Sequence, residues 1–162
     1  MTTLALSAVT FVRRDPDAVF RELHDLEMLV GCVPGATLTR LDDPFAFEAR
    51  IGVGLGPVRA EYRGRGRITA SDPKTRTAAI EVIADPSANL AAVRIRMAMA
   101  IARRTSGSEI RMSFDVAMSQ RTWLLSQAWV DPIACDLLDR TTRRLKHHLE
   151  HDVPVTPLPP AA

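Results

Sequence analysis

Apolar and polar residues alternate along the middle of the chain, which predicts a series of half-buried antiparallel strands. Apolar residues or glycine occupy every second position from Phe45 to Val53 and again from Val58 to Ile68; the residues between them are Ala46, Glu48, Arg50 and Gly52 in the first run and are all charged in the second. The same alternation returns at residues 78–82, 93–101 and 110–118. The Thr105-Ser106-Gly107 connection predicts that the last two of these runs form a hairpin.

Helical spacing replaces the alternation near both ends of the chain. Apolar residues recur every three or four positions from Ile133 to Leu149, which predicts one long amphipathic helix. Residues 16–23 and 25–31 are expected to form two short helices. Asp15-Pro16 and Asp131-Pro132 resemble an Asp N-cap followed by proline, so we expect helices to begin there. The residues from Thr3 to Arg13 resemble a strand, and a shift in apolar parity suggests a bulge near Ser7.

The order of elements is one strand, two short helices, six strands and a long helix, which predicts an α+β fold. We expect a curved antiparallel sheet of about seven strands around the C-terminal helix, since only that helix can cover the apolar face of the sheet. This predicts one domain over residues 1–152. Residues 153–162 contain four prolines and are expected to form a flexible or extended tail.

The inward-facing positions combine large residues with unusually small ones and with methionine. Two interpretations stay open: an adaptable lining for an apolar ligand, or an ordinary core in which methionine fills irregular gaps and glycine bends the sheet. The small inward residues are Ala49, Ala60, Gly64, Gly66 and Ala78, and the inward methionines are Met97, Met99, Met112 and Met118.

The composition sets limits on function. The 162 residues carry a formal net charge of only +2, which gives little electrostatic reason to expect nucleic-acid binding. The two cysteines form no CxxC pair, which favours a reduced, cytoplasmic setting. We expect neither a signal peptide nor a membrane-spanning helix, because no apolar run approaches ~20 residues.

Residues with chemical potential are few, and each has an ordinary structural interpretation beside the functional one. His147, His151 and Asp152 share the end of the last helix, but solvated histidines are favoured there over a metal site. Tyr62 could hydrogen-bond a ligand or serve as a core aromatic. Cys32 is favoured as a small buried hydrophobe over a reactive thiol.

Two further positions are interpreted as parts of the surface. His24 is expected to be a C-cap or surface residue. An outward-facing stripe of arginines comprises Arg59, Arg63, Arg65 and Arg67. We interpret this stripe as a solvated sheet face in preference to a docking surface.

Two segments carry a family resemblance. Residues 29–36 read Leu-Val-Gly-Cys-Val-Pro-Gly-Ala, and residues 47–64 contain the hairpin Gly-Leu-Gly-Pro-Val-Arg-Ala-Glu-Tyr-Arg-Gly. Both are similar to signatures of the CoxG-like family of carbon monoxide dehydrogenase proteins, which belongs to the START/Bet v 1-like (SRPBCC) superfamily. The resemblance is specific over roughly residues 15–70 and implies a helix-grip fold.

The resemblance implies an accessory protein rather than an enzyme. Such a protein would bind a quinone- or lipid-like molecule between sheet and helix, without a covalent cofactor or a metal. It would serve a molybdenum-containing dehydrogenase, with peripheral contact at the inner face of the membrane. Two alternatives remain: a polyketide cyclase or dehydratase-like enzyme acting through Tyr62 or His24, and an assembly factor without a ligand.

The resemblance and the inward pattern together nominate the residues that would line the ligand cavity. Met28 and Pro34 would flank its mouth. The walls would come from Phe47, Ile51, Tyr62, Ile80, Ile95, Met97, Met112 and Phe114 on the sheet and from Trp123, Trp129 and Leu138 on the helix side.

Overall fold

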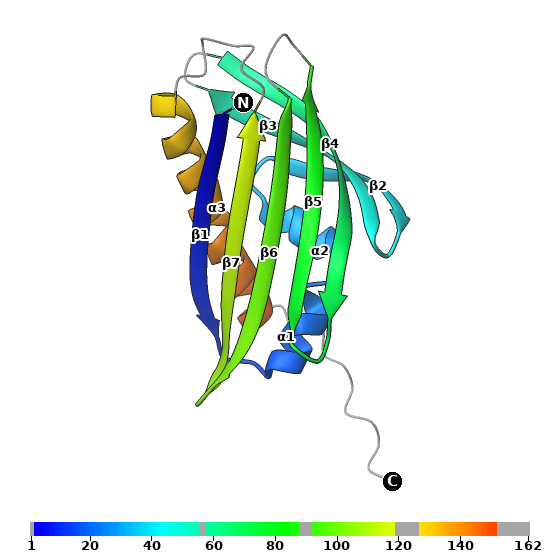
Figure 1. Ribbon diagram of the computed structural model, residues 1–162, viewed down its shortest axis with the longest axis vertical. Coiled ribbons are helices and arrows are strands. Elements are labelled where there is room, and N and C mark those ends of the chain that lie inside the picture. The colour runs from blue at the N-terminus through cyan, green and yellow to red at the C-terminus, as the bar shows by residue number, and fades with distance from the viewer. Residues whose placement is uncertain (1, 56–57, 88–91, 119–126, 152–162) are drawn as a thin grey trace.

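The chain forms a seven-stranded antiparallel sheet that curves around a C-terminal helix (Figure 1). A computed structural model describes residues 2–55, 58–87, 92–118 and 127–151. The strands are β1 (Thr2–Val12), β2 (Ala36–Asp43), β3 (Ala46–Leu55), β4 (Val58–Asp72), β5 (Thr77–Pro86), β6 (Val93–Arg104) and β7 (Gly107–Met118). The helices are α1 (Pro16–Glu22), α2 (Leu26–Cys32) and α3 (Gln127–His151).

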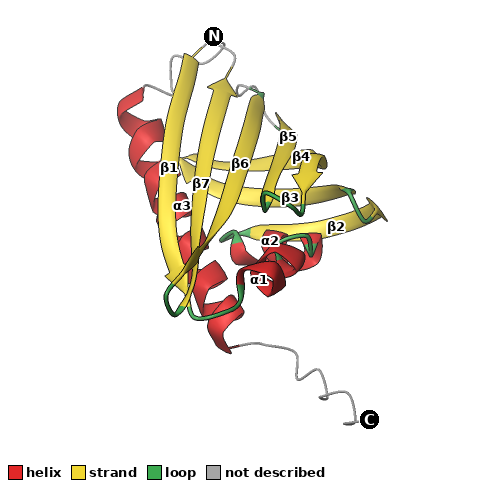
Figure 2. Ribbon diagram, turned by 60° about the horizontal axis from the view of Figure 1, so that its bottom comes forward, coloured by secondary structure: helices red, strands yellow, loops and turns green. Residues whose placement is uncertain are grey.

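The strand order is β1-β7-β6-β5-β4-β3-β2. The strands from β2 to β7 therefore form a continuous meander, while β1 pairs with the last strand and the two short helices carry the chain to the opposite edge. Figure 2 shows α1, α2 and α3 gathered on one side of the sheet. This arrangement confirms the predicted α+β architecture and element order.

α1 begins at the predicted residue, Pro16, and α2 begins at Leu26, one residue after its predicted start. The Asp15 carboxylate accepts hydrogen bonds from the backbone N–H groups of Asp17 and Ala18, and Pro16 occupies the first helical turn. The Asp25 carboxylate likewise accepts from the backbone N–H of Met28. These caps fix the direction in which α1 and α2 cross the open end of the sheet.

A close backbone approach ties the exit of α2 to the sheet. Gly35 has φ +77°, and a Cβ atom there would lie 2.7 Å from the carbonyl oxygen of Gly52. The backbone N–H of Gly52 also donates to the Gly35 carbonyl at 3.2 Å. Any other residue at position 35 would be strained and would push β3 away.

The core lies between the sheet and the helices. On α3, Leu145 and Leu149 are buried, and they join the buried side chains of α1, α2 and the inward sheet face. The predicted inward positions from Ala60 to Ile68 on β4, and those on β5, β6 and β7, are buried or half-buried, and the four arginines of the outward stripe are exposed. These parts of the alternation are confirmed.

Three local expectations were wrong. β1 pairs with β7 in continuous register from Thr2 to Val12, so no bulge occurs near Ser7, and Val9 points outward with 62% exposure. Phe45 precedes β3 in a turn and is 51% exposed. α3 begins at Gln127, so Pro132 lies inside it. Pro132 is the sixth residue of α3, so it removes the hydrogen bond to the carbonyl of residue 128 and its ring crowds that carbonyl, which weakens the second turn of the helix.

An ion cluster braces the β6–β7 hairpin. Glu109 accepts hydrogen bonds from the guanidinium groups of Arg111 and Arg104. The Arg111 hydrogen bond and the charge of Arg104 together outweigh desolvation, so the pKa of the Glu109 carboxyl lies below its ordinary value.

Candidate ligand cavity

An apolar cavity of about 250 Å³ lies between the sheet, α2 and α3. Its walls come from the inward faces of β2 to β7, from the apolar side of α2 together with Leu23 and Val33 at either end of it, and from one stripe of α3. Most of the side chains that line it are apolar, and three of them are methionines.

The cavity exists because small residues stand where large ones would fill the core. Ala49 on β3 and Gly64 on β4 are direct cross-strand partners, and both line it. Ala84 on β5, which pairs with Gly64, lines it as well. These three neighbours leave space that the facing helix does not occupy.

Gly66 serves a different purpose beside the cavity. It is the cross-strand partner of Phe47, and a Cβ atom at Gly66 would overlap the Phe47 ring. The missing side chain therefore lets the ring lie flat against β4. Phe47 is buried and forms part of the cavity wall.

Eight of the thirteen residues nominated from the sequence are brought together in the cavity lining. They are Phe47, Ile51, Ile80, Ile95, Met97, Met112, Phe114 and Leu138.

The other five lie elsewhere or outside the described residues. Met28 lines a separate surface groove, and Pro34 is buried without lining the cavity. Tyr62 packs into a second small cluster with Ala60 and Ala84. Trp123 lies outside the described residues, and the Trp129 side chain does too, although its backbone belongs to α3.

The sequence pattern alone did not reveal the contribution of the short helices. Leu26, Leu29 and Val30 of α2 line the cavity, together with Leu23 at the end of α1. A signal is present, because these residues recur at the three- and four-residue spacing of one helix face. That spacing predicts a helix with a buried side, but not which part of the core the side meets.

The lining contains few groups capable of acid–base chemistry. Its polar side chains are Cys32, Arg50, Thr141 and Thr142. The Thr142 hydroxyl donates to the Leu138 carbonyl oxygen at 2.7 Å, and Arg50 is exposed beside Glu61. Burial raises the pKa of the Cys32 thiol, although the charge of Arg144 partly opposes this. Cys32 is therefore a neutral thiol near pH 7 and a weak nucleophile.

Tyr62 and His24, the residues of the catalytic alternative, lie far apart. His24 hydrogen-bonds through its two ring nitrogens to the Phe20 carbonyl and to the Ser71 hydroxyl, near the end of β4. Tyr62 lies nine residues back along the same strand, which corresponds to about 30 Å. Burial raises the pKa of the Tyr62 phenol. The two side chains cannot act on one small substrate.

The histidines near the end of α3 lie against each other. The rings of His147 and His151 stack with their centroids 4.5 Å apart, and Asp152 lies outside the described residues. Within the described ranges, no group of three or more His, Cys, Asp or Glu side chains is arranged to hold a metal ion.

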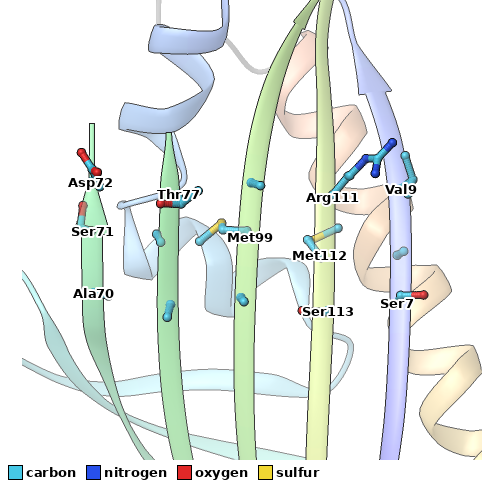
Figure 3. A pocket seen from close by; sticks show the side chains of 15 residues that line it. Ser7, Val9, Ala70, Ser71, Asp72, Thr77, Met99, Arg111, Met112 and Ser113 are labelled. Atoms are coloured by element: carbon cyan, nitrogen blue, oxygen red, sulfur yellow. The ribbon is translucent and has the colours of Figure 1, made fainter. Parts of the chain in front are cut away.

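A shallow depression on the outer face of the sheet is another large concavity (Figure 3). It crosses five strands, where Ser7, Ser113, Ala98, Ala79 and Ala70 form one row of directly paired residues. Small side chains create this depression between flanking rows of larger ones. It is separated from the apolar cavity by the thickness of the sheet.

A curved antiparallel sheet that closes on a long C-terminal helix, with an apolar cavity between them, defines a helix-grip protein. The family model of the carbon monoxide dehydrogenase G subunit (CoxG) matches residues 10–150, and the chain belongs to this family. Among curated protein sequences, none matches this one significantly. None of the described helices has the combined length and apolar character needed to cross a bilayer.

Solved structures support the same fold at low sequence identity. A conserved protein from Geobacillus kaustophilus superposes with a TM-score of 0.76 at 14% identity, covering 90% of this chain and 95% of the other. A START superfamily protein from Mycobacterium smegmatis superposes with a TM-score of 0.59 at 12% identity, covering 90% of this chain and 96% of the other. The Zhui aromatase/cyclase from Streptomyces sp. R1128 superposes with a TM-score of 0.60 at 11% identity, covering 95% of this chain and 100% of the other.

Proposed function

We propose that this protein binds a small apolar molecule, quinone- or lipid-like, in the cavity between the sheet and α3 and acts without catalysis. The observation that supports this is the cavity itself, which is lined by aliphatic and aromatic side chains and opens a space in an otherwise packed core. Ligand sites are typically apolar concavities with a few polar groups, and this cavity fits that description.

The size of the cavity limits what it holds. An apolar cavity of about 150 Å³ is large enough for benzene, so 250 Å³ has room for roughly ten non-hydrogen atoms. This fits the ring of a quinone or a short aliphatic chain. A complete long-chain lipid would leave most of its length outside.

Family membership supports a more specific role as an accessory or carrier protein for a molybdenum-containing dehydrogenase of the carbon monoxide dehydrogenase type. In that role the protein would deliver or protect a redox-active apolar molecule, making only peripheral contact with the membrane. Co-purification of tagged protein from its own cells with such a dehydrogenase tests this part separately from ligand binding.

A cyclase-like enzyme is the second candidate, because the fold is shared with an aromatase/cyclase. Two observations favour binding over catalysis. The cavity lining offers Cys32 as its only half-buried or buried titratable side chain among the described residues, and the raised pKa of that thiol suits it poorly to acid–base work. Tyr62, one residue of the catalytic alternative, lies nine residues along β4 from Ser71, to which the other, His24, is hydrogen-bonded.

Titration with a water-soluble short-chain quinone tests the central proposal. We expect saturable binding by calorimetry in the wild-type protein and a strong loss of affinity in Ala49→Leu, which fills the cavity. Ala98→Leu, on the outer sheet face, is the matched control and should bind normally. Repeated failure to detect binding of quinones or of short-chain lipids, together with empty mass spectra of freshly purified protein, would refute the proposal.

A further inference from the structure

A second depression, of about 500 Å³, lies on the surface where α2 and α3 meet, and we call it the α2/α3 groove. α3 supplies most of its lining through consecutive turns of basic residues, while α2 supplies small and sulfur-containing side chains. The lining comprises Met28, Gly31, Cys32, Arg143, Arg144, His147 and His148.

The α2/α3 groove and the apolar cavity share one wall. Cys32 lines both of them and is only 6% exposed. Its thiol donates a weak hydrogen bond to the Met28 sulfur at 3.8 Å, one helical turn earlier. Methionine changes conformation easily, so this sulfur pair is a thin and adaptable partition between groove and cavity.

The charge of the α2/α3 groove is positive. Arg143 is paired with Asp139 at 2.7 Å, whereas no ion pair within the described part of the chain involves Arg144. The charge of Arg144 reaches the Cys32 thiol at the partition. A Cβ atom at Gly31 would meet nothing within 4 Å, so the α2 side of the groove is open.

The two spaces have complementary chemistry. The cavity lining is mostly apolar and its arginine, Arg50, is exposed and paired with Glu61, whereas the groove next to it offers a guanidinium, that of Arg144, with which no carboxylate of the described residues pairs. Guanidinium groups bind carboxylates through charge-assisted hydrogen bonds with matching planar geometry. A ligand with an apolar body and an acidic end would satisfy both sites at once.

We propose that the α2/α3 groove binds the carboxylate of an amphipathic monocarboxylic acid whose apolar part, of roughly ten carbons, fills the cavity. This inference rests on the proposed function, because it assumes that the cavity takes an apolar group, and it narrows the lipid-like ligands to acids. Arg144 is the residue that recognises the acid, and the Met28–Cys32 partition moves aside for the chain.

Decanoate and 1-decanol, which share the same alkyl chain, provide the test by isothermal titration calorimetry near neutral pH. We expect decanoate to bind the wild-type protein roughly tenfold more tightly than 1-decanol, as one charge-assisted contact provides. Arg144→Gln should remove the preference for decanoate over 1-decanol. Arg140→Gln is the matched control, since Arg140 lies on the same helix and outside the groove lining.

The outcomes separate this inference from the proposed function. Equal binding of decanoate and 1-decanol to the wild-type protein overturns the acid site while supporting the apolar cavity. An acid preference that survives in Arg144→Gln also overturns it. If neither decyl compound binds while a short-chain quinone does, the acid site is overturned and the apolar cavity stands. Because the first comparison uses wild-type protein, it does not depend on the folding of any variant.

Discussion

Filling the apolar cavity should make the protein more stable and weaken its binding of an apolar ligand. Ala49 points into the cavity from β3, between Leu38 and Gly64 on the neighbouring strands. Ala49→Leu adds three carbons to this space. At about 0.8 kcal/mol per buried methylene, the free energy of unfolding should rise by at most about 2.4 kcal/mol.

The increase in the free energy of unfolding is measurable by thermal and urea denaturation. For a chain of this length each kcal/mol raises Tm by roughly 2–4 °C, so the upper limit is an increase of about 5–10 °C. The same three carbons displace about three carbons of ligand, which should weaken binding roughly fiftyfold. The exposed Ala98 is the control, and Ala98→Leu should change stability by less than about 0.5 kcal/mol and binding not at all.

Two results would refute the reasoning. If Ala49→Leu lowers stability, the space is already filled and the added carbons overpack the core, at a cost of about 1–3 kcal/mol. If stability rises while quinone affinity stays at the wild-type level, the ligand binds somewhere other than the cavity.

Three further expectations follow from the structure. Leu149→Ala, at a fully buried position on α3, should lower the free energy of unfolding by about 2–5 kcal/mol in urea denaturation, whereas Leu41→Ala, 52% exposed, should change it by less than about 0.5 kcal/mol. The pKa of Glu109 is lowered in the folded protein, so its ionised carboxylate stabilises the fold at pH values above its ordinary pKa, and this stabilisation is lost as the pH falls through the lowered pKa. On acidification, Tm should therefore fall less in Glu109→Gln than in the wild-type protein. Parallel plots of Tm against pH for the two proteins would contradict this. Iodoacetamide should modify exposed Cys135 well before buried Cys32, as peptide mass spectrometry would show, and equal rates would contradict the packing around α2.

The sheet was predictable because its alternation is regular wherever one face is buried and the other is wet. β2 was the least apparent strand, since it forms an edge, most of its residues are exposed, and two register shifts interrupt its pairing with β3. The shift in apolar parity along β1 led to the wrong prediction of a bulge near Ser7 for a related reason. Val9 is an exposed apolar residue on an outer face, and a sequence alone does not distinguish it from a core residue.

The cavity wall was predictable strand by strand, but its extent was not. Inward alternation places Met97, Met112 and Phe114 on the correct face, yet Tyr62 on that same face packs into a separate cluster. Which inward residues meet depends on how the sheet curves and on where α2 crosses it. Neither depends on local pattern, so the α2/α3 groove and its shared wall could only be found in the structure.

The pairing of β1 with β7 has a consequence for synthesis. β1 is synthesised before every other strand of the sheet, yet Met118, the partner of Thr2, follows only after nearly all of the sheet has been made. Until then β1 has an unpaired edge and an apolar face, and contacts this distant in sequence form slowly. Nascent chains should therefore need chaperone protection of their N-terminal segment, and a permuted chain that starts at β2 and joins β1 directly after β7 should need less.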